Sequence, residues 1–102
     1  RDNIHSHDLV SCFWEFYKKP RNGEVYNIGG GRYSNCSILE ALNLVEKISK
    51  IRIKKNYLKA NRIGDHIWYI SDLTKFKKHY PFWHQIYSTK KIINELIKKF
   101  KY

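Results

Sequence analysis

The spacing of apolar residues predicts four helices, and the first covers residues 8–19. Asp8 is the expected N-cap of this helix, and Pro20 lies just past its end. The apolar residues of this segment recur every three or four positions, which makes one face of an amphipathic helix. That face consists of Leu9, Val10, Phe13, Trp14 and Tyr17.

The other three helices follow further along the chain. Ser37 and Glu40 form a capping box at the start of the second helix. Its buried stripe consists of Ile38, Leu42, Val45 and Ile48. A short third helix, capped by Ser71 or Asp72, comes before the last helix at residues 89–101. The short helix carries Leu73 and Phe76, and the apolar face of the last helix consists of Ile92, Ile93, Leu96, Ile97 and Phe100.

Two segments between these helices have the pattern of short strands. EVYNI (24–28) follows a turn at RNG, and IRIKKNYL (51–58) alternates at its start like an edge strand with lysines on it. The resulting order of elements is αβαβαα. This order predicts a small α+β unit, or one lobe of a larger protein.

The composition favours a folded chain with an anionic partner. Hydrophobic residues make up 42% of the 102 residues, and the net charge is +11. Such a charge attracts anions in general and can support nonspecific nucleic-acid binding. Only five of the 20 cationic residues are arginines, which suit bidentate phosphate recognition better than lysine does. The arginines to examine are therefore Arg1, Arg21, Arg32, Arg52 and Arg62.

The same counts set the expected compartment. The two cysteines are too few for a disulfide framework, and no apolar run approaches the roughly 20 residues that span a bilayer. No secretory leader is visible, so we expect one domain, or a piece of one, in the cytoplasm. The sequence contains no methionine, not even at residue 1, and for this reason we expect a processed or truncated chain.

Arg62 and Asp65, in the stretch NRIGDHIWYISDLTKF (61–76), are the first candidates for ligand binding. Gly64 lies between them and allows a sharp turn that brings both side chains into one cleft. A guanidinium matches phosphate oxygens, and a carboxylate accepts hydrogen bonds from sugar hydroxyls. The alternative is a local surface ion pair, worth under about 1 kcal/mol.

Histidines and glycines near the N-terminal end raise two further hypotheses. His5, His7 and Asp8 suggest a metal site, but zinc usually takes three or four protein ligands, so we favour a core or capping role. The run NIGGGR (27–32) would let backbone amides approach a phosphate. Because it lacks the spacing of a dinucleotide-binding motif or a P-loop, we favour a turn between a strand and a helix.

Trp68 and Tyr69 suit stacking on a nucleotide base, although such aromatic residues usually belong to the core. No arrangement of Ser, His and Asp, of Cys and His, or of paired carboxylates stands out in the sequence. We therefore expect no catalytic residue in this chain.

Four segments, in order, resemble the C-terminal part of the extended short-chain dehydrogenase/reductase family, the NAD-dependent sugar-nucleotide epimerases and dehydratases. RDNIHSHDLV (1–10) resembles its Arg-Asp-x-Ile/Val-His-x-x-Asp segment, and GEVYNIGGG (23–31) its Tyr-Asn-hydrophobic-Gly strand. SILEALNLV (37–45) resembles the helix that follows. NRIGDHIWYISDLTKF resembles the Arg-x-Gly-Asp segment, most of all in the branch of CDP-paratose (tyvelose) 2-epimerases.

This resemblance implies a fold and three substrate-binding residues. Residues 1–102 would form the C-terminal substrate-binding lobe of an α/β Rossmann-type enzyme, without the N-terminal NAD-binding Rossmann domain. Arg1 and Arg62 match the arginines that contact the substrate diphosphate, and Asp65 matches the carboxylate that holds a ribose hydroxyl. The glycine-rich NAD motif of the family is missing, and so is a Tyr-x-x-x-Lys pair at the family position. No cofactor or metal ligand is therefore expected here.

The function implied is that of the substrate-binding part of an NAD-dependent sugar-nucleotide epimerase, an isomerase, which is inactive alone. The implied partners are a nucleoside diphosphate sugar, the missing Rossmann lobe that binds NAD, and a second copy, since the parent enzymes are often dimers. Two alternatives stay open. One is a basic domain that binds nucleic acid or another polyanion, although the order of the motifs argues against nucleic acid. The other is a truncated gene product without activity.

Overall fold

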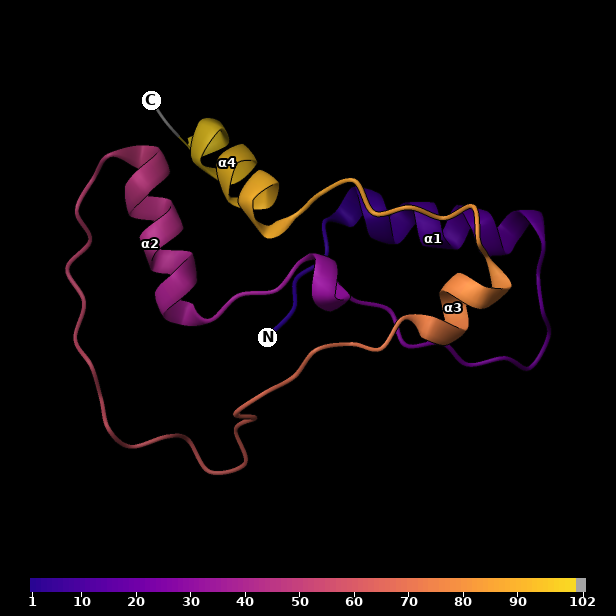
Figure 1. The fold of residues 1–102 in the computed structure, drawn as a ribbon, viewed down its shortest axis with the longest axis horizontal. Helices are drawn as coiled ribbons and strands as arrows, with labels where there is room; N and C mark the ends of the chain where they lie inside the picture. Colours follow the sequence, from indigo (N-terminus) through magenta and orange to yellow (C-terminus); the bar gives the residue numbers. More distant parts are fainter. Residues whose placement is uncertain (101–102) are drawn as a thin grey trace.

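The computed structural model describes residues 1–100, which form four α-helices and one short 3₁₀ helix joined by irregular segments. The elements are α1 (Ser6–Lys18), η1 (Gly31–Tyr33), α2 (Ile38–Ser49), α3 (Thr74–His79) and α4 (Thr89–Phe100). Figure 1 shows α2 beside α4 at one end of the molecule, and α1 with α3 at the other. The segment after α2 runs as a long irregular arm away from the helices before it returns to α3.

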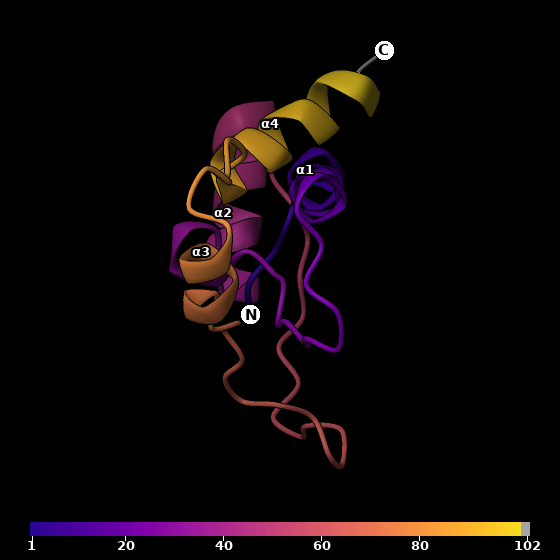
Figure 2. The same cartoon turned by 90° about the vertical axis from the view of Figure 1, so that its right-hand side faces the viewer.

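The molecule is flat. Its extents are 48 × 37 × 17 Å, and the thin direction is seen edge-on in Figure 2. Its radius of gyration is 16.5 Å, against about 13 Å for a compact domain of 100 residues. Domains usually bury apolar faces between two packed layers. Because this molecule is little thicker than one layer of helices, many apolar side chains stay on its surface.

The core lies between α1 and α3 and is largely aromatic. The Phe76 ring stacks on Tyr80 at 4.8 Å between ring centroids and meets Trp83 edge-on at 5.3 Å. Cys12 of α1 and Leu73 are buried with these rings. Ile4, Tyr26 and Ile28 pack against the cluster from outside. Leu73 and Phe76 were both expected on the third helix; Phe76 lies on it, Leu73 is the residue just before it, and both are buried.

The first helix begins at Ser6 and not at Asp8, so the prediction of Asp8 as its N-cap is wrong. His5 is the N-cap, and its Nδ1 accepts a hydrogen bond from the backbone N–H of His7 at 2.9 Å. The capping role expected for at least one of the two histidines is therefore confirmed. Asp8 lies in the first turn, where its side chain is fully buried.

Asp8 ties the start of α1 to the segment before α4. Its two carboxylate oxygens accept hydrogen bonds from the backbone N–H groups of Ile86, at 3.1 Å, and Tyr87, at 3.0 Å. Its backbone carbonyl accepts a hydrogen bond from the Trp83 indole at 3.2 Å. A buried carboxylate is costly unless it is hydrogen-bonded in this way. Asp8 therefore fixes residues that lie almost eighty positions further along the chain.

Of the five residues predicted for the apolar face of α1, Leu9 is partly buried and the other four point to solvent. Val10, Phe13, Trp14 and Tyr17 are between 57% and 74% exposed, whereas Asp8 and Cys12 form the buried side of the helix. We call these four exposed residues the α1 stripe. The stripe is an apolar surface that nothing covers within residues 1–100.

The capping box of the second helix is confirmed. The Ser37 hydroxyl accepts from the Glu40 N–H, the Glu40 carboxylate accepts from the Ser37 N–H, and both distances are 3.1 Å. α2 then packs against α4. Its predicted stripe is only half-buried, since Ile38 is 77% exposed and none of the α2 residues is fully buried.

The third and fourth helices differ from the prediction in detail. α3 begins at Thr74, and Leu73, not Ser71 or Asp72, is its N-cap; Asp72 instead accepts hydrogen bonds from the N–H and hydroxyl of Thr74. α4 ends at Phe100, so residue 101 of the predicted helix lies outside the described residues. The apolar face of α4 is also only partly buried, with Leu96 50% exposed.

Neither predicted strand exists in the described part of the chain. Residues 24–28 and 51–58 are irregular, and the one β-bridge within residues 1–100 joins Asp2 to Asn35. A strand needs a neighbour to take its backbone hydrogen bonds, and no parallel or antiparallel partner runs beside either segment. The helical part of the α+β fold expected from the sequence is therefore confirmed for residues 1–100, and its strand part is not shown there. None of the helices described there is long and apolar enough to cross a bilayer.

Candidate functional site

The N-terminal residues lie between two segments that are distant in the sequence. The Asp2 N–H donates to the Tyr69 carbonyl at 3.2 Å, and the Asn3 N–H donates to the Ser34 carbonyl at 2.9 Å. The Cys36 N–H donates to the Arg1 carbonyl at 3.0 Å. These contacts place Arg1 beside the end of the irregular arm.

The Asp2 carboxylate holds this junction together. Its Oδ2 accepts hydrogen bonds from the backbone N–H groups of Gly31, at 2.9 Å, and Ser71, at 3.0 Å. Burial alone would raise the pKa of Asp2, but the hydrogen bonds from Gly31 and Ser71 outweigh it and lower the pKa below its ordinary value. The ionised form is therefore the one that stabilises the fold.

This arrangement predicts a loss of stability in acid. Because the pKa of Asp2 is lower in the folded state, its contribution is present above the unfolded pKa of about 4 and is lost as the pH falls through the folded pKa. Asp2→Asn can keep an acceptor oxygen in the same place but cannot titrate. We expect the difference in unfolding free energy between wild type and Asp2→Asn, measured in denaturant, to shrink from pH 7 to pH 3. An unchanged difference would contradict this role.

The three residues assigned to substrate binding meet at one point. The Arg1 guanidinium donates a hydrogen bond to Asp65 Oδ1, and the Arg62 guanidinium lies 3.8 Å from Asp65 Oδ2. The Asp65 N–H donates to the Arg62 carbonyl at 3.2 Å, across a turn in which Gly64 has a φ of +79°. The sharp turn expected at Gly64 is confirmed, and it brings both side chains to one place.

Arg1, Arg62 and Asp65 line a cavity of about 690 Å³. We call it the Arg62 cavity. The start of α2 and the end of the irregular arm complete its wall with Ser37, Glu40, His66 and Trp68. The Arg62 side chain is 86% exposed, so a ligand can reach its guanidinium from solvent.

The wall of the Arg62 cavity holds two guanidiniums and three carboxylates, and each carboxylate already has a partner. The two guanidiniums share the carboxylate of Asp65, that of Glu40 is engaged in the capping box of α2, and that of Asp2 accepts hydrogen bonds from the N–H groups of Gly31 and Ser71. The 3.8 Å pair between Arg62 and Asp65 is exposed and therefore weak. The Arg62 guanidinium can consequently exchange this contact for phosphate oxygens at little cost.

The contacts of His5 give it a structural role. The His5 ring stacks on Tyr87 at 3.8 Å between ring centroids, and its Nε2 lies 3.0 Å from a Glu95 carboxylate oxygen. Within residues 1–100, no three residues among His, Cys, Asp and Glu are grouped so that they could hold a metal ion. His5 therefore joins the start of α1 to α4.

The structure gives the glycine run a packing role and leaves Trp68 exposed. Gly29 and Gly30 come just before the 3₁₀ helix η1, which begins at Gly31, and a Cβ on Gly30 would collide with the backbone of Asn3 and Ser34. Close packing therefore explains these glycines. Trp68 is 76% exposed, so the core role considered for it is wrong, and its indole stays open to a ligand.

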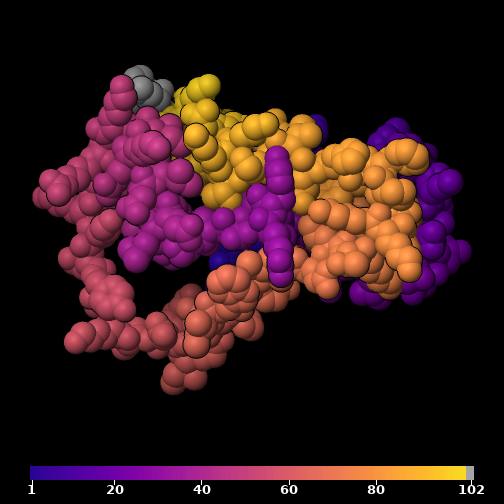
Figure 3. All heavy atoms as spheres, viewed as in Figure 1, coloured from indigo at the N-terminus to yellow at the C-terminus, as the bar shows by residue number. Residues whose placement is uncertain are grey.

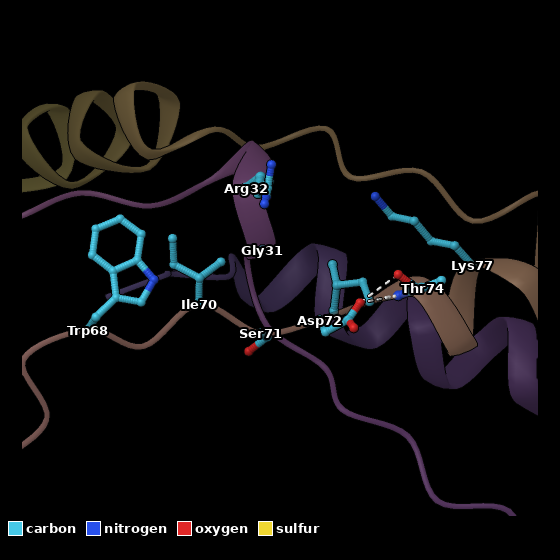
Figure 4. Close-up of a pocket in the computed structure, with 9 residues that line it drawn as sticks. Gly31, Arg32, Trp68, Ile70, Ser71, Asp72, Thr74 and Lys77 are labelled. Atoms are coloured by element: carbon cyan, nitrogen blue, oxygen red, sulfur yellow. Dashed lines mark hydrogen bonds between the residues drawn. The ribbon is translucent and has the colours of Figure 1, made fainter.

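A second cavity, of about 720 Å³, was not predicted from the sequence. Its wall includes Arg32 of η1, Trp68 of the arm, and Lys77 of α3 (Figure 4). We call it the Arg32 cavity. Arg32 was among the arginines to examine, but nothing in its spacing indicates that it lies near Lys77, because the two are joined only by the tertiary fold.

Comparison of the chain with protein-family models, with curated proteins and with solved structures finds no match.

Proposed function

We propose that this chain is the part of an NAD-dependent sugar-nucleotide epimerase that binds the nucleoside diphosphate sugar, and that it is inactive alone. The observation that carries the proposal is the convergence of Arg1 and Arg62 on Asp65, from opposite parts of the chain, in one open cavity. The order of sequence motifs resembles the C-terminal part of that family, and most of all the CDP-paratose 2-epimerase branch. The proposal places the protein in the cytoplasm.

In this proposal the two arginines bind the diphosphate. A diphosphate presents oxygens on two phosphorus atoms, and planar guanidiniums match such oxygens in pairs. Asp65 holds the two guanidiniums beside each other before the ligand arrives. Once they turn to the phosphates, its carboxylate becomes available to accept a hydrogen bond from a ribose hydroxyl.

The flat shape and the α1 stripe support the second half of the proposal, a separate Rossmann lobe that binds NAD and carries the catalytic residues. The stripe presents Val10, Phe13, Trp14 and Tyr17 to solvent on one helix face. Contiguous apolar surface of this kind marks an interface with another protein surface. In the proposal that surface is the Rossmann lobe, and a second copy of the enzyme is a further partner.

Titration of the chain with CDP, UDP and GDP by calorimetry tests the substrate half. We expect binding that is strongest for one base, and an Arg62→Ala variant that binds about tenfold more weakly or worse, because a charge-assisted contact to phosphate is lost. Arg52→Ala is the matched control, since Arg52 is exposed, lies on the same arm and does not line the Arg62 cavity.

Each outcome of this titration separates the proposal from its alternatives. Loss of binding in Arg62→Ala but not in Arg52→Ala supports a built diphosphate site. Equal weakening in both variants, with a steep dependence on salt, supports a basic surface for polyanions instead. No binding of any nucleotide to the wild-type chain contradicts the proposed site in this chain and favours a truncated product without activity.

A further inference from the structure

We propose that the Arg32 cavity binds a phosphate ester that carries a planar ring, of the size of a mononucleotide. This site goes beyond the proposed function, because it contains none of the three residues assigned to the diphosphate sugar. The cavity is lined by residues of η1, of the segment before α3, and of α3 itself. Its volume of about 720 Å³ is within the range of small-molecule sites in proteins.

Two cationic side chains of the Arg32 cavity are available to bind an anion. Neither the Arg32 guanidinium nor the Lys77 ammonium takes part in an ion pair or a side-chain hydrogen bond within residues 1–100. The one carboxylate in the wall, that of Asp72, accepts its hydrogen bonds from the hydroxyl of Thr74, at 2.6 Å, and from its N–H, at 3.0 Å. Two cations therefore face the cavity against one carboxylate that is already engaged.

The arrangement of these groups is visible in Figure 4. The side chains of Arg32 and Lys77 extend on the same side of the segment from Ser71 to Thr74, and Asp72 lies between them. In the space-filling view of Figure 3, the side chains of η1 project across the centre of this face beside the atoms of residues 71–80. A phosphate placed between the two cations would meet a guanidinium fork on one side and an ammonium on the other.

Trp68 supplies the reason to expect a planar ring on the ligand. Its indole forms the far end of the cavity from Lys77 in Figure 4, and it is 76% exposed. An exposed indole that no other ring covers within residues 1–100 is a stacking surface for a nucleotide base. Ile70, between the indole and the cations, adds an apolar floor on which a sugar ring can rest.

Trp68 lines both cavities, so the test must tell them apart. We would titrate the isotope-labelled chain with adenosine monophosphate and follow backbone amide shifts by NMR. Gly31, Thr74 and Lys77 report on the Arg32 cavity alone. Cys36, Ser37 and Ala41 report on the Arg62 cavity alone.

We expect the adenosine monophosphate to shift the first group of amides, with binding about tenfold weaker in an Arg32→Ala, Lys77→Ala double variant. Lys78→Ala is the matched control, because Lys78 is the next residue on α3 and does not line the cavity. Ribose 5-phosphate, which lacks the base, should bind about tenfold more weakly than the nucleotide.

Three results would overturn the proposal. These are shifts confined to Cys36, Ser37 and Ala41, equal affinity of the double variant and the wild type, and equal affinity for ribose 5-phosphate and the nucleotide. Arg62→Ala should leave the shifts at Gly31 and Lys77 in place. The further site can therefore fail while the diphosphate site stands, or stand while the diphosphate site fails.

Discussion

Replacing Asp8 with alanine is expected to destabilise the fold by roughly 3–6 kcal/mol, because each of two backbone N–H groups loses a charge-assisted hydrogen bond. The side chain is fully buried, so water cannot take its place without opening the junction between α1 and the segment before α4. A small domain has only about 5–15 kcal/mol of stability in total. The variant should therefore unfold at a temperature well below the melting temperature of the wild type.

Urea unfolding followed by tryptophan fluorescence measures this effect, because the buried Trp83 indole lies against the Asp8 carbonyl. Asp8→Asn keeps one acceptor oxygen and should lose less stability than Asp8→Ala, which leaves a measurable variant if the alanine form does not fold. Glu46→Ala, which removes an exposed ion pair with Lys55, is the control and should cost under about 1 kcal/mol. An Asp8→Ala variant as stable as that control would contradict the role given to Asp8.

The second large effect is expected for Gly30→Ala. The backbone of Gly30 has an ordinary helical conformation, with φ −74°, so strain in the backbone is not the reason. A Cβ there would collide with the carbonyl oxygens of Asn3 and Ser34, and the Ser34 carbonyl is itself held by a hydrogen bond from the Asn3 N–H. Rigid backbone atoms cannot give way as a side chain does, so we expect a loss of roughly 3 kcal/mol or more.

Gly23→Ala is the matched comparison, because Gly23 has a positive φ and free space around an added Cβ, whereas Gly30 has an ordinary φ and no space. Gly23 has a positive φ of +76° and nothing near its added Cβ, so only conformational strain of roughly 1 kcal/mol is expected. Thermal unfolding of the two variants separates the two causes. If Gly23→Ala were the more damaging variant, close packing at Gly30 would not be the reason for the glycine run.

Gly30→Ala should also displace Arg1 and weaken nucleotide binding.

Local patterns predicted the helices, because helix formation depends on residues three and four positions apart. The capping box of Ser37 and Glu40 is complete within four residues, and it was confirmed. The N-cap of α1 was placed three residues late, at Asp8 in place of His5, since an aspartate at the head of an apolar segment is a common N-cap. Asp8 instead serves partners at the other end of the chain, which no local pattern reveals.

The prediction of the two strands was wrong for a related reason. Alternation in EVYNI and IRIKKNYL describes what a segment could do beside a partner strand, and only the fold decides whether that partner exists. The spacing of apolar residues in α1 likewise predicted an amphipathic helix but not which side would be covered. Here the buried side carries Asp8 and Cys12, and the α1 stripe faces solvent.

The candidate sites, too, were predictable from the sequence only where their residues are close together in it. Arg62 and Asp65 are three residues apart, so their turn could be predicted from Gly64. Arg1 joins them through contacts with residues beyond position 33, and it was assigned only through the resemblance to a family. The meeting of Arg32 and Lys77 at one cavity depends entirely on tertiary structure.

The link between Asp8 and residues 86–87 also determines when the protein can fold during its synthesis. Ribosomes add about 5–20 residues per second, so roughly 4–16 s separate the appearance of Asp8 from that of its backbone partners. Throughout that interval the Asp8 carboxylate lacks both of its backbone N–H partners. Of the four α-helices described here, the first in the sequence is therefore among the last to have all of its contacts in place.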